Sequence, residues 1–235
     1  MDQEKRLRIA LVTGANRGIG FAVAKGLLQQ GVTVIATGRK LADLKQAAEE
    51  LRTHGQLSYQ QLDVTDHNSI SACYNFVAEE FGRLDYLINN AGINYDTWHN
   101  VQNADLDEVR QTIETNTIGP WQMINSFLPL LRNSEAASIV NVSSGAGDLN
   151  RQNGTTPGYS LSKLALNGLT LQFSHALAAD GIIVNSVCPG WVRTNMGGMQ
   201  ADRSPEEGAE TIIWAATMEE RVSGKFFRDK VEIEW

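Results

Sequence analysis

Residues 13–22 read TGANRGIGFA and directly follow an apolar run at residues 9–12. Three glycines, Gly14, Gly18 and Gly20, stand where this run ends and a stretch with helical apolar spacing begins. Because glycine has no Cβ atom, its backbone can approach a pyrophosphate closely, and the free N–H groups of a helix N-terminus bind phosphate. A tight turn alone explains any one of these glycines, but three between a strand and a helix favour a dinucleotide-binding loop. Their spacing, Gly-x-x-x-Gly-x-Gly, differs from the general Gly-x-Gly-x-x-Gly fingerprint.

The rest of the chain alternates between short β-branched runs and longer amphipathic stretches. Strands are expected within residues 8–14, 32–38, 58–64, 84–90, 137–144 and 182–190. Helices are expected within residues 21–30, 41–52, 70–81, 106–131 and 160–179. This alternation predicts βαβ units, whose apolar strands belong in a parallel sheet. We therefore expect residues 1–235 to form a single α/β domain, a Rossmann-type doubly wound parallel sheet with helices on both faces.

Composition narrows the class of partner. The net charge of −7 and the lack of a Lys/Arg run argue against nucleic-acid binding. The two cysteines, Cys73 and Cys188, lie far apart without metal-ligand spacing, so neither a disulfide nor a metal site is indicated. The N-terminal residues lack the pattern of a signal peptide, and no apolar run is long enough to cross a membrane. We expect a cytoplasmic protein with a small-molecule partner.

The second expected strand indicates which dinucleotide binds. NAD-binding chains carry a carboxylate about 20 residues after the glycine loop, whereas an Arg there accommodates the 2′-phosphate of NADP. Residues 34–40 read VIATGRK, with Arg39 and no acid, and Arg17 in the glycine loop could approach the same phosphate. Arg39 and Lys40 could instead only solvate the start of a helix, but that does not explain the missing carboxylate. The sequence favours NADP(H) as cofactor.

Candidate catalytic residues follow the fifth expected strand. Ser143 and Ser144 end that strand, and Tyr159 and Lys163 come four residues apart in the next expected helix. That spacing places the phenol and the ammonium on one helix face, where the positive charge favours phenolate and lowers a pKa of about 10. A tuned phenol of this kind can donate a proton to a carbonyl oxygen. Taken alone, a Tyr-x-x-x-Lys pair also occurs on ordinary solvated helices.

Further motifs occur in order along the chain: DV at residues 63–64, NNAG at 89–92, Asn116, VNVSS at 140–144, YSLSK at 159–163 and CPGWVRT at 188–194. Together with TGANRGIG, they resemble the short-chain dehydrogenase/reductase family over nearly the whole chain. The resemblance implies that Ser144 binds the substrate carbonyl and that Tyr159 gives or takes its proton. Lys163 would lower the pKa of Tyr159 and hold the nicotinamide ribose, while Asn116 would order a water in the proton relay. Ser143 is the less favoured serine, although a register error of one residue would exchange the two.

The same resemblance assigns the cofactor-binding residues. They are Gly14, Asn16, Arg17, Gly18, Ile19, Gly20, Arg39, Asp63, Val64, Asn90, Gly92, Tyr159, Lys163, Val192 and Thr194. Within this set, the pair at 63–64 would flank the adenine, and the last two residues would meet the nicotinamide end.

Within the family, the chain is most similar to NADPH-dependent carbonyl reductases, which as a class reduce ketones, aldehydes and quinones. The better-known animal members carry a long insertion between the catalytic serine and tyrosine, where this chain has only GAGDLNRQNGTTPG. In the family that insertion covers helices that otherwise associate, so we expect a homodimer or homotetramer through the two long helices. The shorter segment also implies a more open substrate pocket.

Two segments are expected to shape that pocket. Tyr95, Trp98 and His99 follow NNAG and either face the nicotinamide or pack as a surface loop. Residues 196–203, MGGMQADR, predict a mobile lid that ends at a helix capped by Ser204 with a capping-box Glu207. Trp191 and Trp214 are treated as structural.

Three functions are compatible with these residues. The first is NADPH-dependent reduction of a carbonyl to an alcohol. The second is oxidation or reduction of a dedicated metabolite such as a steroid, a pteridine or an acyl-carrier intermediate. The third is a regulator that senses NADP(H) without turnover, against which the intact Ser144, Tyr159, Lys163 and Asn116 argue.

Overall fold

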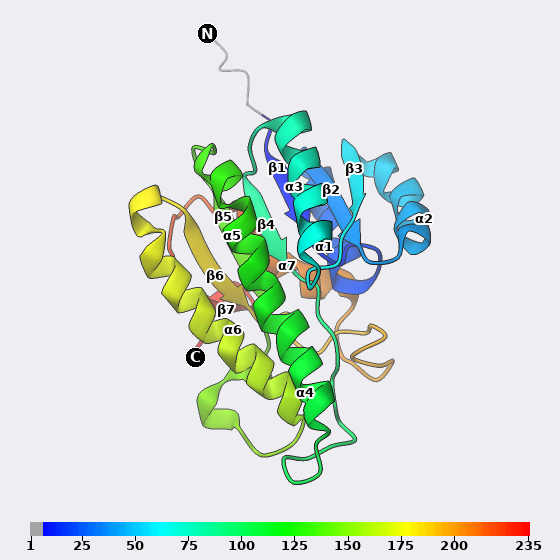
Figure 1. The fold of residues 1–235 in the computed structure, drawn as a ribbon, viewed down its shortest axis with the longest axis vertical. Coiled ribbons are helices and arrows are strands. Elements are labelled where there is room, and N and C mark those ends of the chain that lie inside the picture. The colour runs from blue at the N-terminus through cyan, green and yellow to red at the C-terminus, as the bar shows by residue number, and fades with distance from the viewer. Residues whose placement is uncertain (1–6) are drawn as a thin grey trace.

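A single eight-stranded sheet forms the centre of the protein, in the computed structural model that describes residues 7–235 (Figure 1). Its strands are β1 (Ile9–Val12), β2 (Thr33–Gly38), β3 (Leu57–Gln61), β4 (Tyr86–Asn89), β5 (Ser138–Val142), β6 (Ile183–Val187), β7 (Phe226–Arg228) and β8 (Val231–Glu232). Their order across the sheet is β3-β2-β1-β4-β5-β6-β7-β8. The order reverses between β1 and β4, which is where ligands bind in doubly wound sheets.

The six expected strands and their parallel pairing are confirmed. The sequence analysis missed β7 and β8, which have only three and two residues. The sheet is parallel as expected except for β8, which runs antiparallel to β7. Asp229 and Lys230 make the tight turn between them with φ values of 55° and 61°. Two left-handed residues are typical of a tight hairpin turn, although the usual Asn-Gly or Asp-Gly signal is absent here.

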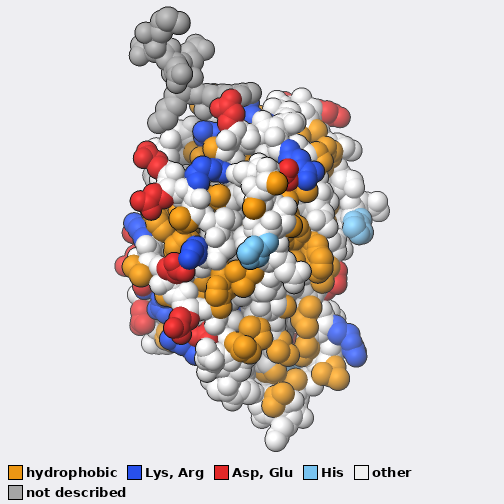
Figure 2. Space-filling model, turned by 90° about the vertical axis from the view of Figure 1, so that its left-hand side faces the viewer, with side chains coloured by type: hydrophobic (Ala, Val, Ile, Leu, Met, Phe, Trp, Pro, Cys, Tyr) orange, Lys and Arg blue, Asp and Glu red, His pale blue; other side chains and the backbone are white. Residues whose placement is uncertain are grey.

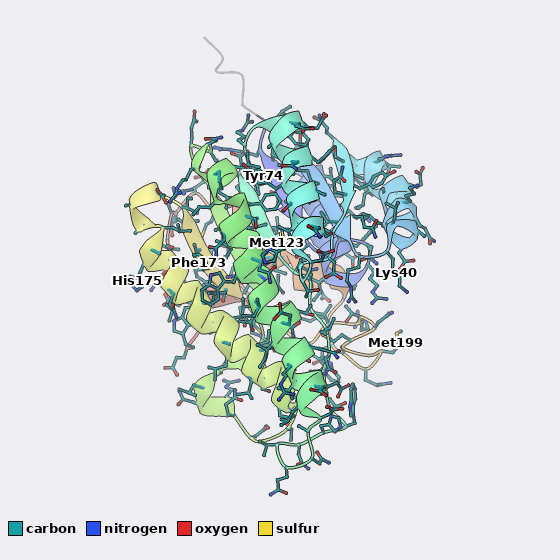
Figure 3. All side chains as sticks on the ribbon, viewed as in Figure 1. Lys40, Tyr74, Met123, Phe173, His175 and Met199 are labelled. Atoms are coloured by element: carbon teal, nitrogen blue, oxygen red, sulfur yellow. The ribbon has the colours of Figure 1, made fainter. Side chains whose placement is uncertain are left out.

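In the part of the chain that the structure describes, seven α-helices connect the strands and cover both faces of the sheet. They are α1 (Gly18–Gln29), α2 (Leu41–Leu51), α3 (His67–Phe81), α4 (Leu106–Ile113), α5 (Gly119–Arg132), α6 (Pro157–Ala176) and α7 (Pro205–Thr217). One hydrophobic cluster packs α1, α2 and α7 against one face of the sheet. A second packs α3, α5 and α6 against the other face, with Tyr74, Met123 and Phe173 among its side chains (Figure 3). The doubly wound arrangement is thus confirmed.

The long helix expected within residues 106–131 is interrupted. A π-helical turn at Glu114–Ile118 separates α4 from α5 and contains the buried Asn116. Such turns inside α-helices are frequent at functional sites. The other buried residues of this turn are Thr115 and Thr117, so the turn has no apolar pattern that would mark it in the sequence.

Other boundaries differ by a few residues. α1 begins at Gly18 and α6 at Pro157, each three residues before the expected start. α7 begins at Pro205 with Ser204 and Glu207 forming the expected capping box. Among residues 7–235, no helix is both long and apolar enough to cross a bilayer.

Candidate active site

A cleft of about 380 Å³ opens at the carboxyl ends of the central strands. Thirteen of the expected site residues line it: Gly14, Asn16, Arg17, Gly18, Ile19, Gly20, Arg39, Val64, Asn90, Gly92, Tyr159, Lys163 and Thr194. Four others, Asp63, Asn116, Ser144 and Val192, are not among its lining residues. The fold therefore gathers most of the candidates, scattered over 180 positions of sequence, around one cavity.

The glycine loop is held in shape by β4. Gly14 and Gly18 have φ values of 66° and 58°, a region that side-chain-bearing residues rarely adopt. A Cβ atom on Gly20 would overlap the Gly14 carbonyl oxygen and the Asn90 amide. The Asn90 Nδ2 donates hydrogen bonds to the Thr13 and Gly14 carbonyl oxygens, at 2.8 and 3.2 Å. Asn90 thus braces the loop as well as lining the cleft.

One end of the cleft is strongly basic. Arg17 and Arg39 are both exposed there, Arg193 and Lys163 also line the cavity, and none of its described lining residues is Asp or Glu. This is notable in a chain with a net charge of −7. Positive groups concentrated in a concave site attract anionic ligands such as phosphates.

The pair at residues 63–64 differs in detail from the expectation. Val64 lines the cleft, whereas the Asp63 carboxylate accepts hydrogen bonds from the Thr65 N–H at 3.0 Å and its hydroxyl at 2.7 Å. The Asp63 N–H donates to the Ser69 hydroxyl at 2.9 Å. Asp63 therefore shapes the turn before α3, which brings Val64 to the cavity.

Helix α6 carries the Tyr159 and Lys163 pair. The Lys163 Nζ lies 5.6 Å from the centroid of the Tyr159 ring, so the predicted shared face is present. Lys163 is buried, and its Nζ donates a 2.8 Å hydrogen bond to the Val142 carbonyl oxygen at the end of β5. The ammonium is thereby fixed between the helix and the sheet.

Buried polar contacts dock α6 on the sheet. The Asn141 Nδ2 on β5 donates to the Thr170 hydroxyl on α6 at 2.9 Å. Gly147 lies so close to the α6 backbone that a Cβ atom there would stand 2.7 Å from the Lys163 carbonyl carbon. Because such contacts require one register, they define where the Tyr159 and Lys163 side chains emerge.

The two serines after β5 have different surroundings. Ser143 is buried, and its hydroxyl lies 3.5 Å from the Lys163 carbonyl oxygen. Ser144 is half-buried, its hydroxyl accepts from the Ala146 N–H at 3.1 Å, and its side chain lowers the pKa of the Tyr159 phenol. Ser143 lines the cleft and Ser144 does not, so the choice between the two serines stays a prediction.

Burial is the main cause of the pKa shifts of Tyr159 and Lys163. It raises the pKa of the Tyr159 phenol above its ordinary value, and the hydrogen bond with Ser144 opposes this only in part. Burial also lowers the pKa of the Lys163 ammonium to about 8. The net direction at Tyr159 is opposite to the lowering that the sequence analysis expected from Lys163, because burial of the phenolate is the largest influence on this pKa.

Asn116 lies behind the cleft rather than in its wall. Its Oδ1 accepts from the Ile93 N–H at 2.9 Å, and its Nδ2 donates to the Ile93 carbonyl oxygen and the Ser162 hydroxyl, both at 3.0 Å. Both polar atoms of the side chain therefore have protein partners. The side chain joins the π turn to the segment after β4 and to α6.

The aromatic residues after NNAG separate into different roles. The Tyr95 ring packs edge-on against the Tyr159 ring with 5.1 Å between centroids. Trp98 is 61% exposed, and the His99 Nδ1 lies 3.3 Å from the Glu108 carboxylate. Only Tyr95 thus contacts an expected catalytic residue.

The expected lid has several hydrogen bonds to its flanks. The Trp191 indole donates to the Gly197 carbonyl oxygen at 2.8 Å, and the Arg193 guanidinium donates to the carbonyl oxygens of Ala201 and Asp202. Met199, labelled in Figure 3, is 82% exposed on this loop. The segment is therefore a tethered loop beside the cleft, and Trp191 holds it.

Sequence reasoning missed one residue of the site. The Asp96 carboxylate, on the loop between β4 and α4, accepts hydrogen bonds from the backbone N–H groups of Gly158 and Tyr159. No sequence signal marks it, because a single Asp in a polar loop is ordinary.

Comparison with known proteins agrees with this geometry. Residues 8–205 match the family model described as short chain dehydrogenase. The chain belongs to the short chain dehydrogenase family. Members of this family are oxidoreductases that act on alcohol and carbonyl groups, and this chain has the same fold.

Individual short chain dehydrogenases are similar over almost the full chain. Carbonyl reductase [NADPH] 1 of Sus scrofa is 33% identical, covering 97% of this chain and 94% of its own. Short-chain dehydrogenase anuI of Penicillium roqueforti strain FM164 is 38% identical, covering 97% of each chain. The NADPH-bound carbonyl reductase from chicken fatty liver superposes with a TM-score of 0.88 at 33% identity, covering 98% of this chain and 100% of its own.

Proposed function

We propose that this protein reduces apolar carbonyl compounds to alcohols with NADPH. The observation that carries the proposal is the cleft itself, which joins a glycine loop, a basic end without carboxylates and the Tyr159–Lys163 pair. The names of the similar pig and chicken proteins, both carbonyl reductases with NADPH, support the same reading.

The cleft fits an NADP-type dinucleotide. Gly14, Gly18 and Gly20 form a tight loop at the N-terminus of α1, where the free N–H groups and the positive end of the helix dipole would bind a pyrophosphate. Arg17 and Arg39 would pair with the 2′-phosphate, since no acid in the described cleft wall would repel it. Bound NADPH would supply the hydride that reduces the carbonyl carbon.

The remaining expected contacts extend along the same cofactor. Val64 would contact the adenine, with Asp63 holding the turn behind it. Asn90 and Gly92 would line the middle of the cleft, and Thr194 would meet the nicotinamide end, with the buried Val192 supporting it.

Tyr159 would protonate the carbonyl oxygen. Because burial raises the pKa of its phenol, the group stays protonated at neutral pH and is ready to donate in the reductive direction. Ser144 would hold the same oxygen through its hydroxyl. Lys163 would help to return a proton to Tyr159. Asn116 would hold the π turn and the segment after β4 in place, because its polar atoms are bonded to Ile93 and Ser162 and do not bind the water expected of it.

The rim of the site supports an apolar substrate. Tyr95 stands 37% exposed beside Tyr159, while Trp191, Met196 and Met199 present apolar surface from the loop on the other side. Exposed aromatic and methionine side chains around a catalytic group bind apolar ligands by burying surface. Bulky ketones, aldehydes and quinones have this character.

We also propose that the chain forms a homodimer or homotetramer through α5 and α6. Trp121 on α5 packs edge-on against Phe173 on α6, yet 43% of Trp121 stays exposed, and Leu161 on α6 is 46% exposed. Figure 2 shows apolar side chains gathered on the face that includes α6. Exposed patches of this kind mark protein–protein contacts. Light scattering should find a mass of two or four chains, and Trp121→Glu should lower it; a monomeric wild type would contradict the proposal.

The test of the proposed function follows NADPH absorbance with purified protein and a panel of quinones, aromatic ketones, aldehydes and steroid ketones. We expect turnover with several apolar members and a much weaker rate with NADH. Turnover of a single steroid or pteridine would favour a dedicated metabolite enzyme. Tight NADPH binding without turnover of any member would contradict reduction and favour a sensor.

A further inference from the structure

The first turn of α6, which carries Tyr159, has an unusual cap. Its N-cap residue Thr156 has a φ of 46° and makes no side-chain hydrogen bond to the helix N–H groups. Pro157 follows and has no N–H to donate. The N–H of Ser160 already donates to the Thr156 carbonyl oxygen at 2.8 Å. The N–H groups of Gly158 and Tyr159 are therefore the ones that need a partner.

Asp96 supplies both acceptors from a distant part of the chain. Its Oδ2 accepts from the Gly158 N–H at 2.8 Å, and its Oδ1 accepts from the Tyr159 N–H at 3.2 Å. Asp96 is only 1% exposed and forms no salt bridge within residues 7–235. A negative carboxylate is stabilised there by the positive end of the helix dipole.

The loop that carries Asp96 is itself anchored to the site. Ile93 exchanges two hydrogen bonds with the Asn116 amide, and the Asn94 Nδ2 donates to the Thr112 hydroxyl at 3.0 Å. The neighbouring Tyr95 ring contacts the Tyr159 ring. In Figure 1 the loop between β4 and α4 reaches the lower end of the molecule, where α6 begins. Residues 95 and 96 of this loop therefore contact both the ring and the backbone N–H of Tyr159.

We propose that Asp96 is a positioning residue for catalysis. It fixes where Tyr159 lies along the α6 axis and the direction in which the Tyr159 side chain leaves the helix. This inference rests on the proposed role of Tyr159 as proton donor. Proton transfer and hydride transfer require reacting atoms within a narrow distance, and a displacement of about 1 Å can lower a rate about 100-fold. Asp96 acts through the Tyr159 backbone and does not itself touch the substrate.

The key variant is Asp96→Asn, which keeps size and removes one of the two acceptors. An amide offers one oxygen, so its NH₂ group would face either the Gly158 or the Tyr159 N–H, donor against donor. The matched control is Asp66→Asn at the N-cap of α3. The Asp66 side chain accepts a single hydrogen bond there, from the Asn68 N–H, and the one oxygen of an Asn side chain can accept it equally well. Gly158→Ala is a second variant, because its Cβ would press on the Asp96 Oδ2 at 3.2 Å while favouring the helix.

The experiment measures kcat, the solvent deuterium isotope effect on kcat and the NADPH dissociation constant, each on protein shown to be folded. We expect Asp96→Asn to lower kcat by roughly 10- to 100-fold and to raise the isotope effect, with a much smaller change in NADPH binding. Gly158→Ala should change the same quantities in the same direction. Asp66→Asn should leave them at wild-type values.

A double variant separates positioning from simple loss of stability. In a Tyr159→Phe background, Asp96→Asn should produce little further loss, because the group that it positions is gone. Wild-type kcat in folded Asp96→Asn and Gly158→Ala, or a full multiplicative loss in the double variant, would overturn the inference. Wild-type kcat in Tyr159→Phe alone would instead overturn the proposed function.

Discussion

Replacing Lys163 with Met should stabilise the protein while abolishing its activity. Lys163 is 5% exposed, and its pKa falls from 10.5 to about 8 because burial disfavours the charged form. At about 1.4 kcal/mol per tenfold change, that shift corresponds to a destabilisation of about 3 kcal/mol at pH 7. Losing the hydrogen bond to the Val142 carbonyl oxygen costs about 1 kcal/mol. Met keeps most of the aliphatic stem, so we expect a net gain of about 2 kcal/mol.

The stability difference between Lys163→Met and wild type should depend on pH. Between the folded pKa of about 8 and the unfolded pKa of 10.5, the unfolded chain binds the Lys163 proton and the folded protein does not. The destabilisation is therefore complete below pH 8 and disappears as the pH rises toward 10.5. The advantage of Lys163→Met over wild type should shrink by about 3 kcal/mol over that range.

Urea unfolding of both proteins at about pH 7 and pH 10 measures this difference directly. The exposed Lys45 on α2 offers a control, since Lys45→Met should change stability by less than about 0.5 kcal/mol at pH 7. The reasoning would be refuted if Lys163→Met were less stable than wild type at pH 7 and the difference in stability were the same at pH 10.

Two further substitutions test the cofactor and the serine assignments. Arg39→Asp should raise the KM for NADPH by roughly 10- to 100-fold, as expected for a lost charge-assisted hydrogen bond, and lower it for NADH; an equal loss with both cofactors would exclude Arg39 as the selecting residue. Ser144→Ala should lower kcat by about 100-fold or more, the usual effect of losing an oxyanion donor, whereas Ser143→Ala should leave kcat near wild type. The opposite ranking would exchange the two serines.

The sheet and the cofactor loop were predictable because their signals are local. Six strands of four to six residues carry apolar runs, and the glycines at 14, 18 and 20 lie within one turn. β7 and β8 escaped because two or three residues show no periodicity, and their Asp229-Lys230 turn lacks a common turn signal. The π turn around Asn116 escaped because its buried side chains, Thr115, Asn116 and Thr117, are polar and give no signal that distinguishes a π turn from an α-helix.

The fold gathers most of the predicted site residues around one cleft, but the sequence did not reveal how they interact. Spacing alone placed Tyr159 and Lys163 on one helix face, but it carried no information about burial, which reverses the expected direction of the Tyr159 pKa. Asp96 acts across more than 60 residues of sequence on backbone N–H groups, which no side-chain pattern reveals. The role of such a residue follows only from the three-dimensional arrangement of the hydrogen bonds at the α6 N-terminus.

Hydride transfer from NADPH to a carbonyl compound is the central claim, and an isotope label follows it directly. The protein would be incubated with an apolar ketone and NADPH that carries deuterium at both positions of nicotinamide C4, and the product analysed by mass spectrometry. The account predicts an alcohol that has gained one deuterium with wild-type protein, formed much more slowly with Tyr159→Phe. Bound NADPH with no labelled product from any carbonyl would contradict it.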